Sequence, residues 1–382
     1  MTKVAIVAGE SSGDQLGAEL IRGLRSLLPD VEIYGMCGPK MRAEGCTALA
    51  DIEELSVMGL AEVLRKYPSL RKLRARLTED LIALRADVFI GIDVPDFVHY
   101  IERKLKDAGT KTVHYVAPQV WAWRPQRAKS LSRAIDLLLV LFPFEPKFFS
   151  DYGIQTQFVG HPLVNKISEN VSRNEHTESL GLAADKRYIA MMPGSRKQEL
   201  RRHTALFCDV TEQLARIYPD AIFLFGAVHD DAAAYIEAEL GQRALQDRAK
   251  VVVGNSHAIL GAADLGLVVS GTVTMEALLS KTPIVVAIRL AKLSHFILKR
   301  LVTTRFVAMP NILAQTTLVP EFVQNDATVE NLVTALGTWL DDAERVADFG
   351  LRSNAIRKSL QSPRDNAAAN AIVELAFAGK GS

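Results

Sequence analysis

The sequence has little cysteine and lacks an apolar run long enough to span a bilayer. Its three cysteines, Cys37, Cys46 and Cys208, lie in or beside apolar segments and show no CxxC spacing. This usage favours a reducing compartment and argues against a disulfide framework or a cysteine-bound metal. No apolar stretch approaches the ~20 residues of a spanning helix, and the amino terminus enters a strand without a secretion signal. We therefore expect a cytoplasmic protein that is soluble or attached only to a membrane surface.

The sequence also lacks an excess of positive or negative charge. Lys and Arg number 45 against 44 Asp and Glu, which leaves a net charge of +1. A chain this balanced has no bulk attraction for nucleic acid, so we expect no such partner. The dinucleotide fingerprint is absent as well, because the stretch VAGESSGDQLG contains Gly9 and Gly13 but no G-x-G. A nicotinamide is disfavoured, and we expect neither a cofactor nor a metal.

Short apolar runs alternate with amphipathic helical patterns, which predicts α/β domains with parallel sheets. Strands of a first series are expected at residues 4–7, 31–36, 88–92, 112–116, 137–142 and 157–159. Strands of a second series are expected at 188–192, 221–225, 251–253, 265–269 and 283–287. The hydrophilic stretch 165–185 between the two series is interpreted as a linker.

This pattern predicts two Rossmann-like, doubly wound domains facing a cleft, the GT-B arrangement of many glycosyltransferases and of several binding proteins. We place the first domain at 1–165 and the second at 166–345. A helical segment at 346–382 would follow, with packing back on the first domain as one option. Open α/β sheets bind their ligands beyond the carboxyl ends of the strands, so polar residues at those ends are the functional candidates.

The first strand leads into Gly9, Glu10 and a predicted helix. A carboxylate at a strand end points toward the ligand site, which makes Glu10 a candidate catalytic residue. The alternative is purely structural: glycines allow the tight turn, and Ser12 or Asp14 caps the helix.

Two further motifs of the first half carry polar groups at strand ends. In GIDVPDF, Asp93 lies at the tip of a strand, where a carboxylate can take the proton from an attacking sugar hydroxyl. Asp96 is more readily explained as a helix cap. In HYVAPQVWAWR, His114, Trp121, Trp123 and Arg124 follow the next strand, and both packing and substrate binding fit the two tryptophans.

The second half carries two strand-to-helix loops. In PGSRKQEL, Gly194 and Ser195 turn the chain and Arg196 projects, so that free backbone N–H groups and a cation converge where a phosphate fits. A capped turn with a surface arginine is the alternative. In VVSGTVTMEALL, the residues 270–272 (Ser270, Gly271, Thr272) form a second loop, and Glu276 follows one helical turn later. Together the two loops favour a nucleoside-diphosphate site.

A resemblance to a known family covers nearly the whole chain. The motifs that carry it are, in order, GESSGD, VMGLAEVL, GIDVPDF, HYVAPQVWAWR, FVGHPL, PGSR, SGTVTMEAL and PNILA. The chain resembles the lipid-A-disaccharide synthases, a GT-B family (glycosyltransferase family 19) that requires no metal. The resemblance implies transfer of 2,3-diacylglucosamine from UDP to the 6-hydroxyl of 2,3-diacylglucosamine 1-phosphate. Anomeric inversion would give the β-1′,6-linked disaccharide 1-phosphate and UDP.

The resemblance also implies residue roles. Asp93 matches the family's base, Arg196 its phosphate-binding arginine, Glu276 its ribose-binding acid and Asn311 the asparagine of its PNLLA-type motif. The family's charged run after that motif is replaced here by Gln315, Thr316 and Thr317, which puts the roles of those positions in doubt. To the acceptor and its acyl chains we assign Ser12, Met58, Gln119, Trp123, Leu70, Leu73 and Leu77.

A basic amphipathic segment at 62–84 suits such lipid substrates. It joins a leucine stripe to six cations, a pattern typical of segments that lie on anionic bilayers. With the resemblance, we expect this bilayer to be the cytoplasmic face of a bacterial inner membrane. Pro68 predicts a break within it. The alternative is a domain helix with a solvated face, and segment 290–305 is similarly either a second membrane contact or core.

Two alternative functions and the oligomeric state stay open at this point. A nucleotide-sugar 2-epimerase of the same fold would need no lipid acceptor. A non-catalytic sugar-nucleotide or lipid-binding protein would need no base at Asp93. A homo-oligomer is also left open.

Overall fold

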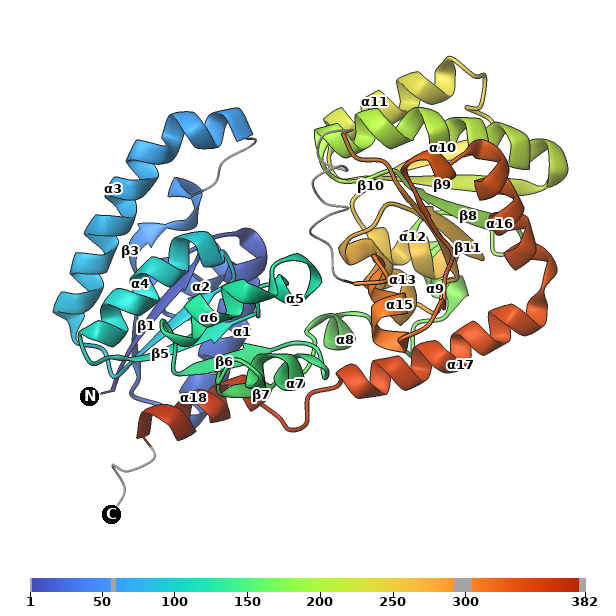
Figure 1. The fold of residues 1–382 in the computed structure, drawn as a ribbon. Coiled ribbons are helices and arrows are strands. Elements are labelled where there is room, and N and C mark those ends of the chain that lie inside the picture. Colours follow the sequence, from blue (N-terminus) through green and yellow to red (C-terminus); the bar gives the residue numbers. More distant parts are fainter. Residues whose placement is uncertain (1, 56–59, 292–303, 378–382) are drawn as a thin grey trace. The chain divides into compact units, whose positions relative to one another are not determined.

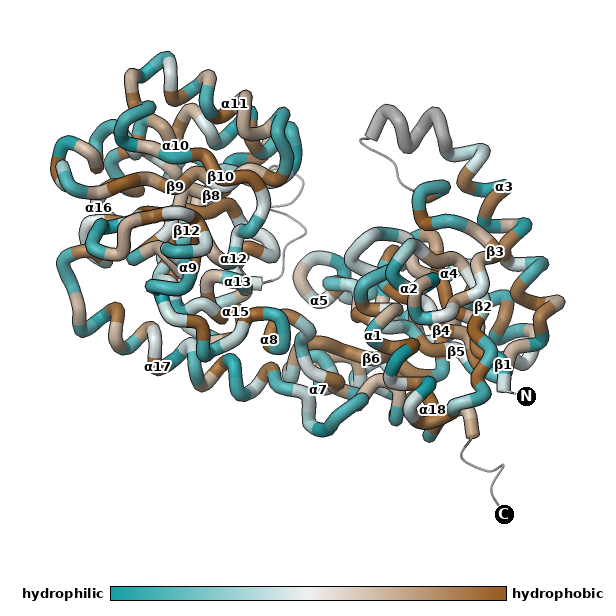
Figure 2. Tube along the Cα trace, turned by 180° about the vertical axis from the view of Figure 1, so that it is seen from behind, coloured by the Kyte–Doolittle hydropathy of each residue, from teal (hydrophilic) through white to brown (hydrophobic). Residues whose placement is uncertain are grey.

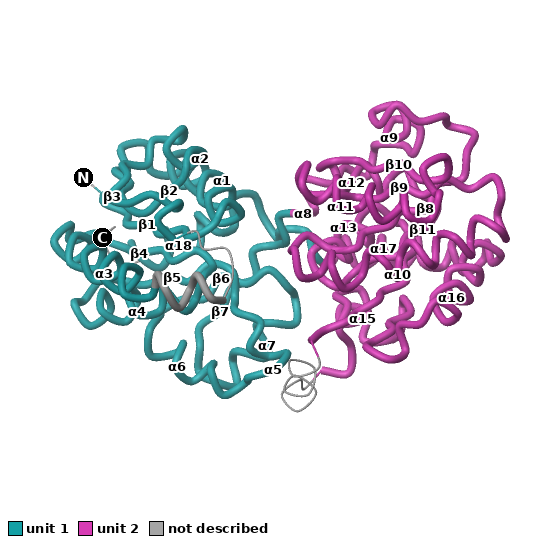
Figure 3. Tube along the Cα trace, turned by 90° about the horizontal axis from the view of Figure 1, so that it is seen from above, with its two compact units in different colours: residues 1–162, 360–382 teal, residues 163–359 magenta. Residues whose placement is uncertain are grey.

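The structure, a computed structural model, describes residues 2–55, 60–291 and 304–377 (Figure 1). The chain divides into two compact units: unit 1 comprises residues 1–162 and 360–382, and unit 2 comprises residues 163–359 (Figure 3). The predicted boundary after residue 165 lies close to this division. Of the predicted segment 346–382, only the part from residue 360 onward belongs to unit 1.

Unit 1 is built on a seven-stranded parallel sheet in the order β3-β2-β1-β4-β5-β6-β7. Its strands are β1 (Lys3–Ala8), β2 (Glu32–Cys37), β3 (Thr47–Asp51), β4 (Val88–Ile92), β5 (Lys111–Tyr115), β6 (Leu137–Val140) and β7 (Thr156–Phe158). The edge strand β3 was not predicted. The direction of winding reverses between β1 and β4, so the carboxyl ends of these two strands flank the place where such sheets bind ligands.

Helices cover both faces of this sheet. The crossover helix α1 (Ser11–Leu27) leads to β2, whereas α3 (Leu60–Leu84) and α4 (Pro95–Asp107) precede and follow β4. Because right-handed crossovers run in opposite directions here, α1 lies on one face and α3 and α4 on the other. The last helix, α18 (Ala367–Phe377), packs on α1.

Unit 2 repeats this plan with a six-stranded parallel sheet in the order β10-β9-β8-β11-β12-β13. Its strands are β8 (Arg187–Met192), β9 (Ala221–Ala227), β10 (Ala249–Val253), β11 (Leu265–Val268), β12 (Ile284–Ile288) and β13 (Glu321–Val323). The short edge strand β13 was not predicted. Here the winding reverses between β8 and β11, which are the strands that precede the two predicted nucleotide loops.

The predicted linker 165–185 is wrong in part, because it contains helix α9 (Arg173–Ser179). Ser172 and Glu175 form a reciprocal cap at the start of this helix. Helix α9 packs on α12 (Ser256–Ala262), where a Cβ at Gly261 would lie only 2.3 Å from the His176 ring. The segment therefore belongs to the body of unit 2.

Helix α3 packs its leucine stripe inward. Leu73, Leu77 and Leu81 are 8%, 1% and 0% exposed and join a core with Phe89 of β4. The prediction that Leu73 and Leu77 contact lipid is therefore wrong, since they face the sheet. In Figure 2 the strands are mostly brown, whereas α3 alternates between brown and teal, as expected of a helix with one buried face.

The predicted break at Pro68 is also wrong, because α3 continues through this residue. A proline within a helix removes one backbone hydrogen bond. Pro68 lies on an exposed turn, and the buried leucines that follow hold the rest of the helix against the sheet.

Leu77→Ala is expected to lower the free energy of unfolding by about 2–5 kcal/mol, because it leaves a cavity in this core. Urea unfolding followed by circular dichroism measures the loss. Ile82→Ala on the same helix is the control, since Ile82 is 39% exposed, and it should cost less than about 1 kcal/mol. Weakened liposome binding by Leu77→Ala at unchanged stability would restore the lipid-contact prediction.

Candidate active site

Asp93 stands at the end of β4 in an uncommon backbone conformation. Asp93 and Val94 have φ values of 54° and 44°, a region that a β-branched residue such as Val94 rarely adopts. The Asp93 N–H donates to the carbonyl of Tyr115 on β5 at 3.0 Å, which fixes the turn to the neighbouring strand. Asp93 Oδ1 accepts the Val94 N–H at 2.8 Å, and Oδ2 has no hydrogen-bond partner within the described residues. The half-buried carboxylate thus keeps one oxygen available for chemistry.

Glu10 follows β1, on the other side of the winding reversal. It is the N-cap residue of α1, yet its side chain makes no capping hydrogen bond and is exposed. Gly9 before it allows a close approach, because a Cβ there would lie 2.5 Å from Leu55 and 2.6 Å from Val94. The structure thus places Glu10 and Asp93 at the ends of two adjacent strands.

The alternative that Ser12 or Asp14 caps the first helix is wrong, because the N-cap residue is Glu10. Asp14 is buried, and its carboxylate accepts the N–H groups of Gly38, Lys40 and Met41 at 2.9, 2.9 and 3.1 Å. It therefore caps the short helix α2 (Pro39–Ala43) after β2. Ser12 is exposed in the first turn of α1, beside Glu10.

A hollow of about 810 Å³ opens beside these strand ends within unit 1. Three kinds of residue line it: acids that include Glu10 and Asp96, apolar groups that include Leu70 and Phe97, and the cations Lys40, Arg71 and Arg74. Val94, next to Asp93, is also part of the wall. The hollow can therefore hold a molecule with polar, apolar and anionic parts near both candidate carboxylates.

The predicted loop 114–124 divides into buried and exposed residues. Trp121 is core: it is 8% exposed and its Nε1–H donates to Glu145 at 3.2 Å. Burial raises the pKa of the Glu145 carboxyl to about 7, although hydrogen bonds from Phe142, Trp121 and Leu141 oppose that shift. Gln119 is exposed and Trp123 is half-buried, with the guanidinium of Arg124 4.6 Å above its ring. Gln119, Trp123 and the exposed Arg124 therefore remain candidates for substrate contact, whereas Trp121 does not.

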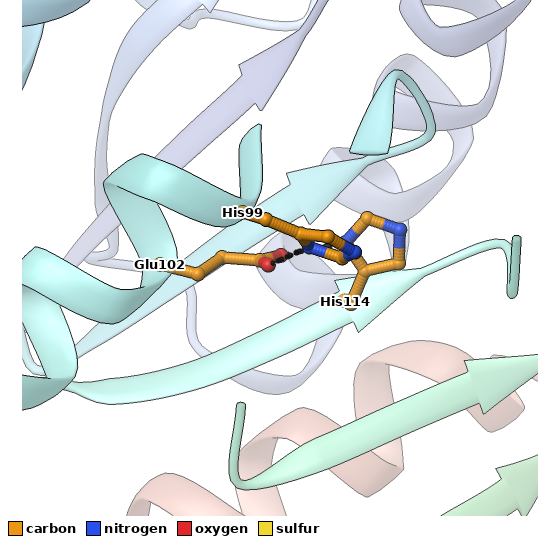
Figure 4. A group of neighbouring side chains, drawn as sticks. All are labelled: His99, Glu102 and His114. Atoms are coloured by element: carbon orange, nitrogen blue, oxygen red, sulfur yellow. Dashed lines mark hydrogen bonds and ion pairs between the residues drawn. The ribbon is translucent and has the colours of Figure 1, made fainter. Parts of the chain in front are cut away.

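His114 belongs to a buried cluster that the sequence did not reveal. Its Nδ1 lies 2.6 Å from one oxygen of Glu102, and His99 Nδ1 lies 2.6 Å from the other (Figure 4). These three side chains could also hold a metal ion. At 2.6 Å both contacts are short hydrogen bonds, so we interpret Glu102 as a bridge between the two imidazoles.

The ionisation of Glu102 agrees with this interpretation. Burial raises the pKa of the Glu102 carboxyl. The charge of His114 and the hydrogen bonds from both histidines lower it by more than burial raises it, so the pKa lies below the ordinary value. Glu102 and His99 are on α4 and His114 is on β5. The cluster therefore ties α4, which begins directly after the Asp93 turn, to the strand that holds the Asp93 N–H.

In unit 2, the turn after β8 has the predicted shape, but its N–H groups are occupied. The N–H groups of Ser195 and Arg196 donate to Glu199 Oε2 at 3.0 and 3.2 Å, and Arg196 Nη1 lies 3.3 Å from Glu199 Oε1. The prediction of free N–H groups is therefore wrong, since Glu199 caps helix α10 (Lys197–Ile217) from within. Gly194 has φ +121°, and a Cβ there would lie 2.4 Å from Glu199, so only glycine fits.

The capped turn holds a carboxylate where a phosphate was predicted. A carboxylate held by two backbone N–H groups and a guanidinium occupies the position that suits a phosphate oxygen. The Arg196 side chain is 85% exposed and free to rearrange.

The second loop follows β11, the neighbour of β8. Ser270 Oγ donates to the carbonyl of Val307 at 3.3 Å, and Gly271 caps helix α13 (Thr272–Leu279) with φ +155°. Half-buried Glu276 accepts a hydrogen bond of 2.5 Å from Ser256 Oγ at the start of α12. The structure thus places both loops at the ends of adjacent strands and fixes the Glu276 carboxylate through Ser256.

Asn311 does not fit its predicted role in UDP binding. It is fully buried, its Nδ2 donates to Val319 O and Glu321 Oε1, and its Oδ1 accepts the N–H groups of Leu318 and Val319. All its hydrogen-bonding positions are therefore used within unit 2. Met58 and residues 292–303 of the segment 290–305 lie outside the described residues.

Comparison with known proteins decides the family. The chain matches the family model of lipid-A-disaccharide synthetases over residues 4–375. It is 44% identical to a lipid-A-disaccharide synthase of Pseudomonas aeruginosa (strain UCBPP-PA14) over 377 residues, which cover 98% of each chain. The chain belongs to the lipid-A-disaccharide synthase family. Lipid-A-disaccharide synthases are glycosyltransferases that use a sugar-nucleotide donor, so the predicted enzyme class is confirmed, and neither the epimerase nor the binding-protein alternative is favoured.

Solved structures confirm the fold class of this lipid-A-disaccharide synthase family member. A "ugt transferase" from Siraitia grosvenorii in complex with UDP matches with a TM-score of 0.63 at 12% identity, covering 98% of this chain and 100% of that one. The UDP-GlcNAc 2-epimerase of Neisseria meningitidis bound to UDP-GlcNAc matches with a TM-score of 0.59 at 10% identity, covering 94% and 99%. At such identities the likeness concerns the fold alone, which is the predicted GT-B class. No helix among the described residues is both long and apolar enough to cross a membrane.

Four residues of these sites were missed in the sequence. Glu199 had a signal, an acid three residues into a predicted helix, which is the pattern of a reciprocal cap. Lys40, Glu102 and Ser256 had none, because each meets its site only through the packing of distant elements.

Proposed function

We propose that this chain transfers 2,3-diacylglucosamine from UDP-2,3-diacylglucosamine to the 6-hydroxyl of 2,3-diacylglucosamine 1-phosphate. The observation that carries the proposal is the Asp93 carboxylate, which has one oxygen without a hydrogen-bond partner among the described residues and whose neighbour Val94 lines a hollow with apolar and cationic walls. Inversion at the anomeric carbon needs one base and no covalent intermediate. Asp93 is that base, and Glu10, at the end of the adjacent strand, is the second carboxylate near the acceptor hydroxyl.

The donor binds in unit 2 at the ends of β8 and β11. Gly194, Ser195 and Arg196 hold the diphosphate together with the loop formed by Ser270, Gly271 and Thr272. Glu276 accepts hydrogen bonds from the ribose hydroxyls. Negative charge grows on the departing UDP, and Arg196 with the backbone N–H groups stabilises it.

The acceptor binds in unit 1, in the hollow beside Glu10. Leu70 lines this hollow and Ser12 is exposed next to Ser11 of its wall, whereas Gln119 and Trp123 lie on the loop after β5. Leu73 and Leu77 have no part in binding, because they are core. Exposed cations on α3 such as Lys72 attract an anionic bilayer, which brings the enzyme to the cytoplasmic face of the membrane that holds both lipids.

One assay tests the proposal against its rivals. Purified protein is incubated with UDP-2,3-diacylglucosamine, with and without the acylated acceptor, and UDP and sugar products are measured. UDP release that depends on the acceptor supports the proposal. An epimer formed without the acceptor would indicate an isomerase, and the absence of any product would indicate a binding protein.

The turn after β8 predicts an unusual gain of affinity. Because Glu199 occupies the anion position, the diphosphate must displace a carboxylate of its own charge. Glu199→Gln removes that charge and is expected to tighten UDP binding by roughly 3- to 10-fold, measured by isothermal titration calorimetry at low salt. Glu212→Gln, at a half-buried acid further along α10 that pairs with Arg216, is the control. Weaker UDP binding by Glu199→Gln would instead mean that Glu199 holds Arg196 in its binding position.

A further inference from the structure

The cations around the hollow in unit 1 are not paired with acids. Lys40 contacts the side-chain oxygen of Gln15, and Arg74 lies 4.5 Å from the Tyr100 ring centre and 3.4 Å from the carbonyl of Asp96. For the described residues, no carboxylate lies within ion-pair distance of Lys40, Arg71 or Arg74. Among the described residues, the positive charge of each of these side chains is therefore not balanced by a carboxylate within ion-pair distance.

Nearby arginines outside the hollow behave differently. Arg76, on the same helix as Arg71 and Arg74, pairs with Glu54 at 3.3 Å. Arg42, close to Lys40 in sequence, pairs with Asp51 at 2.5 Å. Arg42 and Arg76 are thus paired with acids, whereas the three cations that line the hollow are not paired among the described residues.

Two acids in the wall of the hollow are themselves engaged. Asp14 is bound by three backbone N–H groups, and Asp96 pairs with Arg127 at 2.6 Å. Glu10 and Glu53 also line the hollow. The cations come from α2 and from α3, whereas Glu10 stands at the end of β1. The wall therefore has cations from two helices, and Glu10 at the end of β1 is an acid of the wall with no ion-pair partner among the described residues.

We propose that Lys40, Arg71 and Arg74 form a subsite for the phosphate monoester of the acceptor sugar. The inference rests on the proposed function and extends it to the group that selects a phosphorylated acceptor. A dianionic phosphate accepts charge-assisted hydrogen bonds from arginine and lysine better than any neutral hydroxyl does. With the phosphate at the helices, the sugar extends toward the strand ends, where Glu10 and the Asp93 turn meet its hydroxyl.

The test compares two acceptors that differ only in this phosphate, both presented in neutral detergent micelles. They are 2,3-diacylglucosamine 1-phosphate and 2,3-diacylglucosamine with a free anomeric hydroxyl. In the double variant Arg71→Gln/Arg74→Gln we expect KM for the phosphorylated acceptor to rise roughly 10-fold or more, and KM for the other to stay within about 2-fold. Affinity for UDP should not change, which shows that the variant is folded. Arg76→Gln is the matched control on α3 and should leave both KM values as they are.

The other possible outcomes would overturn the proposal, and they also distinguish the acceptor phosphate from a phosphate of the bilayer. An equal rise in KM for both acceptors, or no rise, overturns the subsite. The phosphate head group of a bilayer lipid is the other source of the same chemistry: a loss seen for both acceptors in anionic vesicles, and for neither in neutral micelles, assigns the cations to the membrane and overturns the inference. Wild-type enzyme that transfers to neither acceptor overturns the proposed function and the subsite with it.

Discussion

Replacing Asp93 by Asn is expected to lower the rate of transfer by about 10²- to 10⁴-fold while leaving the affinity for UDP unchanged. The amide has the shape of the carboxylate but cannot take the proton of the attacking hydroxyl. Asparagine also tolerates the positive φ of 54° at this position, so the turn should persist. Initial rates at saturating donor and acceptor, together with UDP calorimetry, measure the two quantities.

Asp96→Asn is the control for this experiment. Its carboxylate is 80% exposed and pairs with Arg127, so its removal should cost far less activity. A rate for Asp93→Asn that is similar to that of Asp96→Asn would exclude Asp93 as the base. Glu10→Gln would then be the next variant to measure.

Arg196→Ala is expected to reduce the rate of transfer by about 10²- to 10³-fold, because it removes the cation that stabilises the negative charge developing on the leaving diphosphate. The affinity for UDP should fall as well, because ground state and product both carry that charge. Competition with radiolabelled UDP and single-turnover rates separate the two effects.

Arg201→Ala gives the comparison, because Arg201 is an exposed arginine on the same helix, beyond its first turn. Its loss should change neither quantity by more than about 2-fold if the effect of Arg196 is local and not one of net charge. Unaltered UDP affinity in Arg196→Ala would place the donor site elsewhere in unit 2.

Most of the fold follows from local patterns, and the exceptions have a physical cause. Strands such as β4 are buried on both faces and therefore appear as continuous apolar runs. The edge strands β3 and β13 are only partly buried, and their sequences TALAD and EFV carry no such signal. Helix α9 was assigned to a linker because it is largely polar and only Thr177 within it is buried.

The candidate sites could be predicted where the chemistry lies in one motif. Asp93, Arg196 and Glu276 are recognisable because each follows a strand directly or opens the next helix. Leu77 shows the limit, because an amphipathic stripe does not reveal whether its apolar face meets a sheet or a membrane. Asn311 shows another, because only the structure reveals that Leu318, Val319 and Glu321 saturate its amide.

The return of the chain to unit 1 has a consequence for folding during translation. Helix α1 is synthesised long before α18, which packs on it so closely that a Cβ at Gly23 would lie 3.1 Å from Ala369. Unit 2 is continuous in sequence and has all its residues before α18 emerges. The unit that holds Asp93 therefore becomes complete after unit 2 during translation, and its nascent form exposes an apolar helix face to chaperones and proteases until α18 is made.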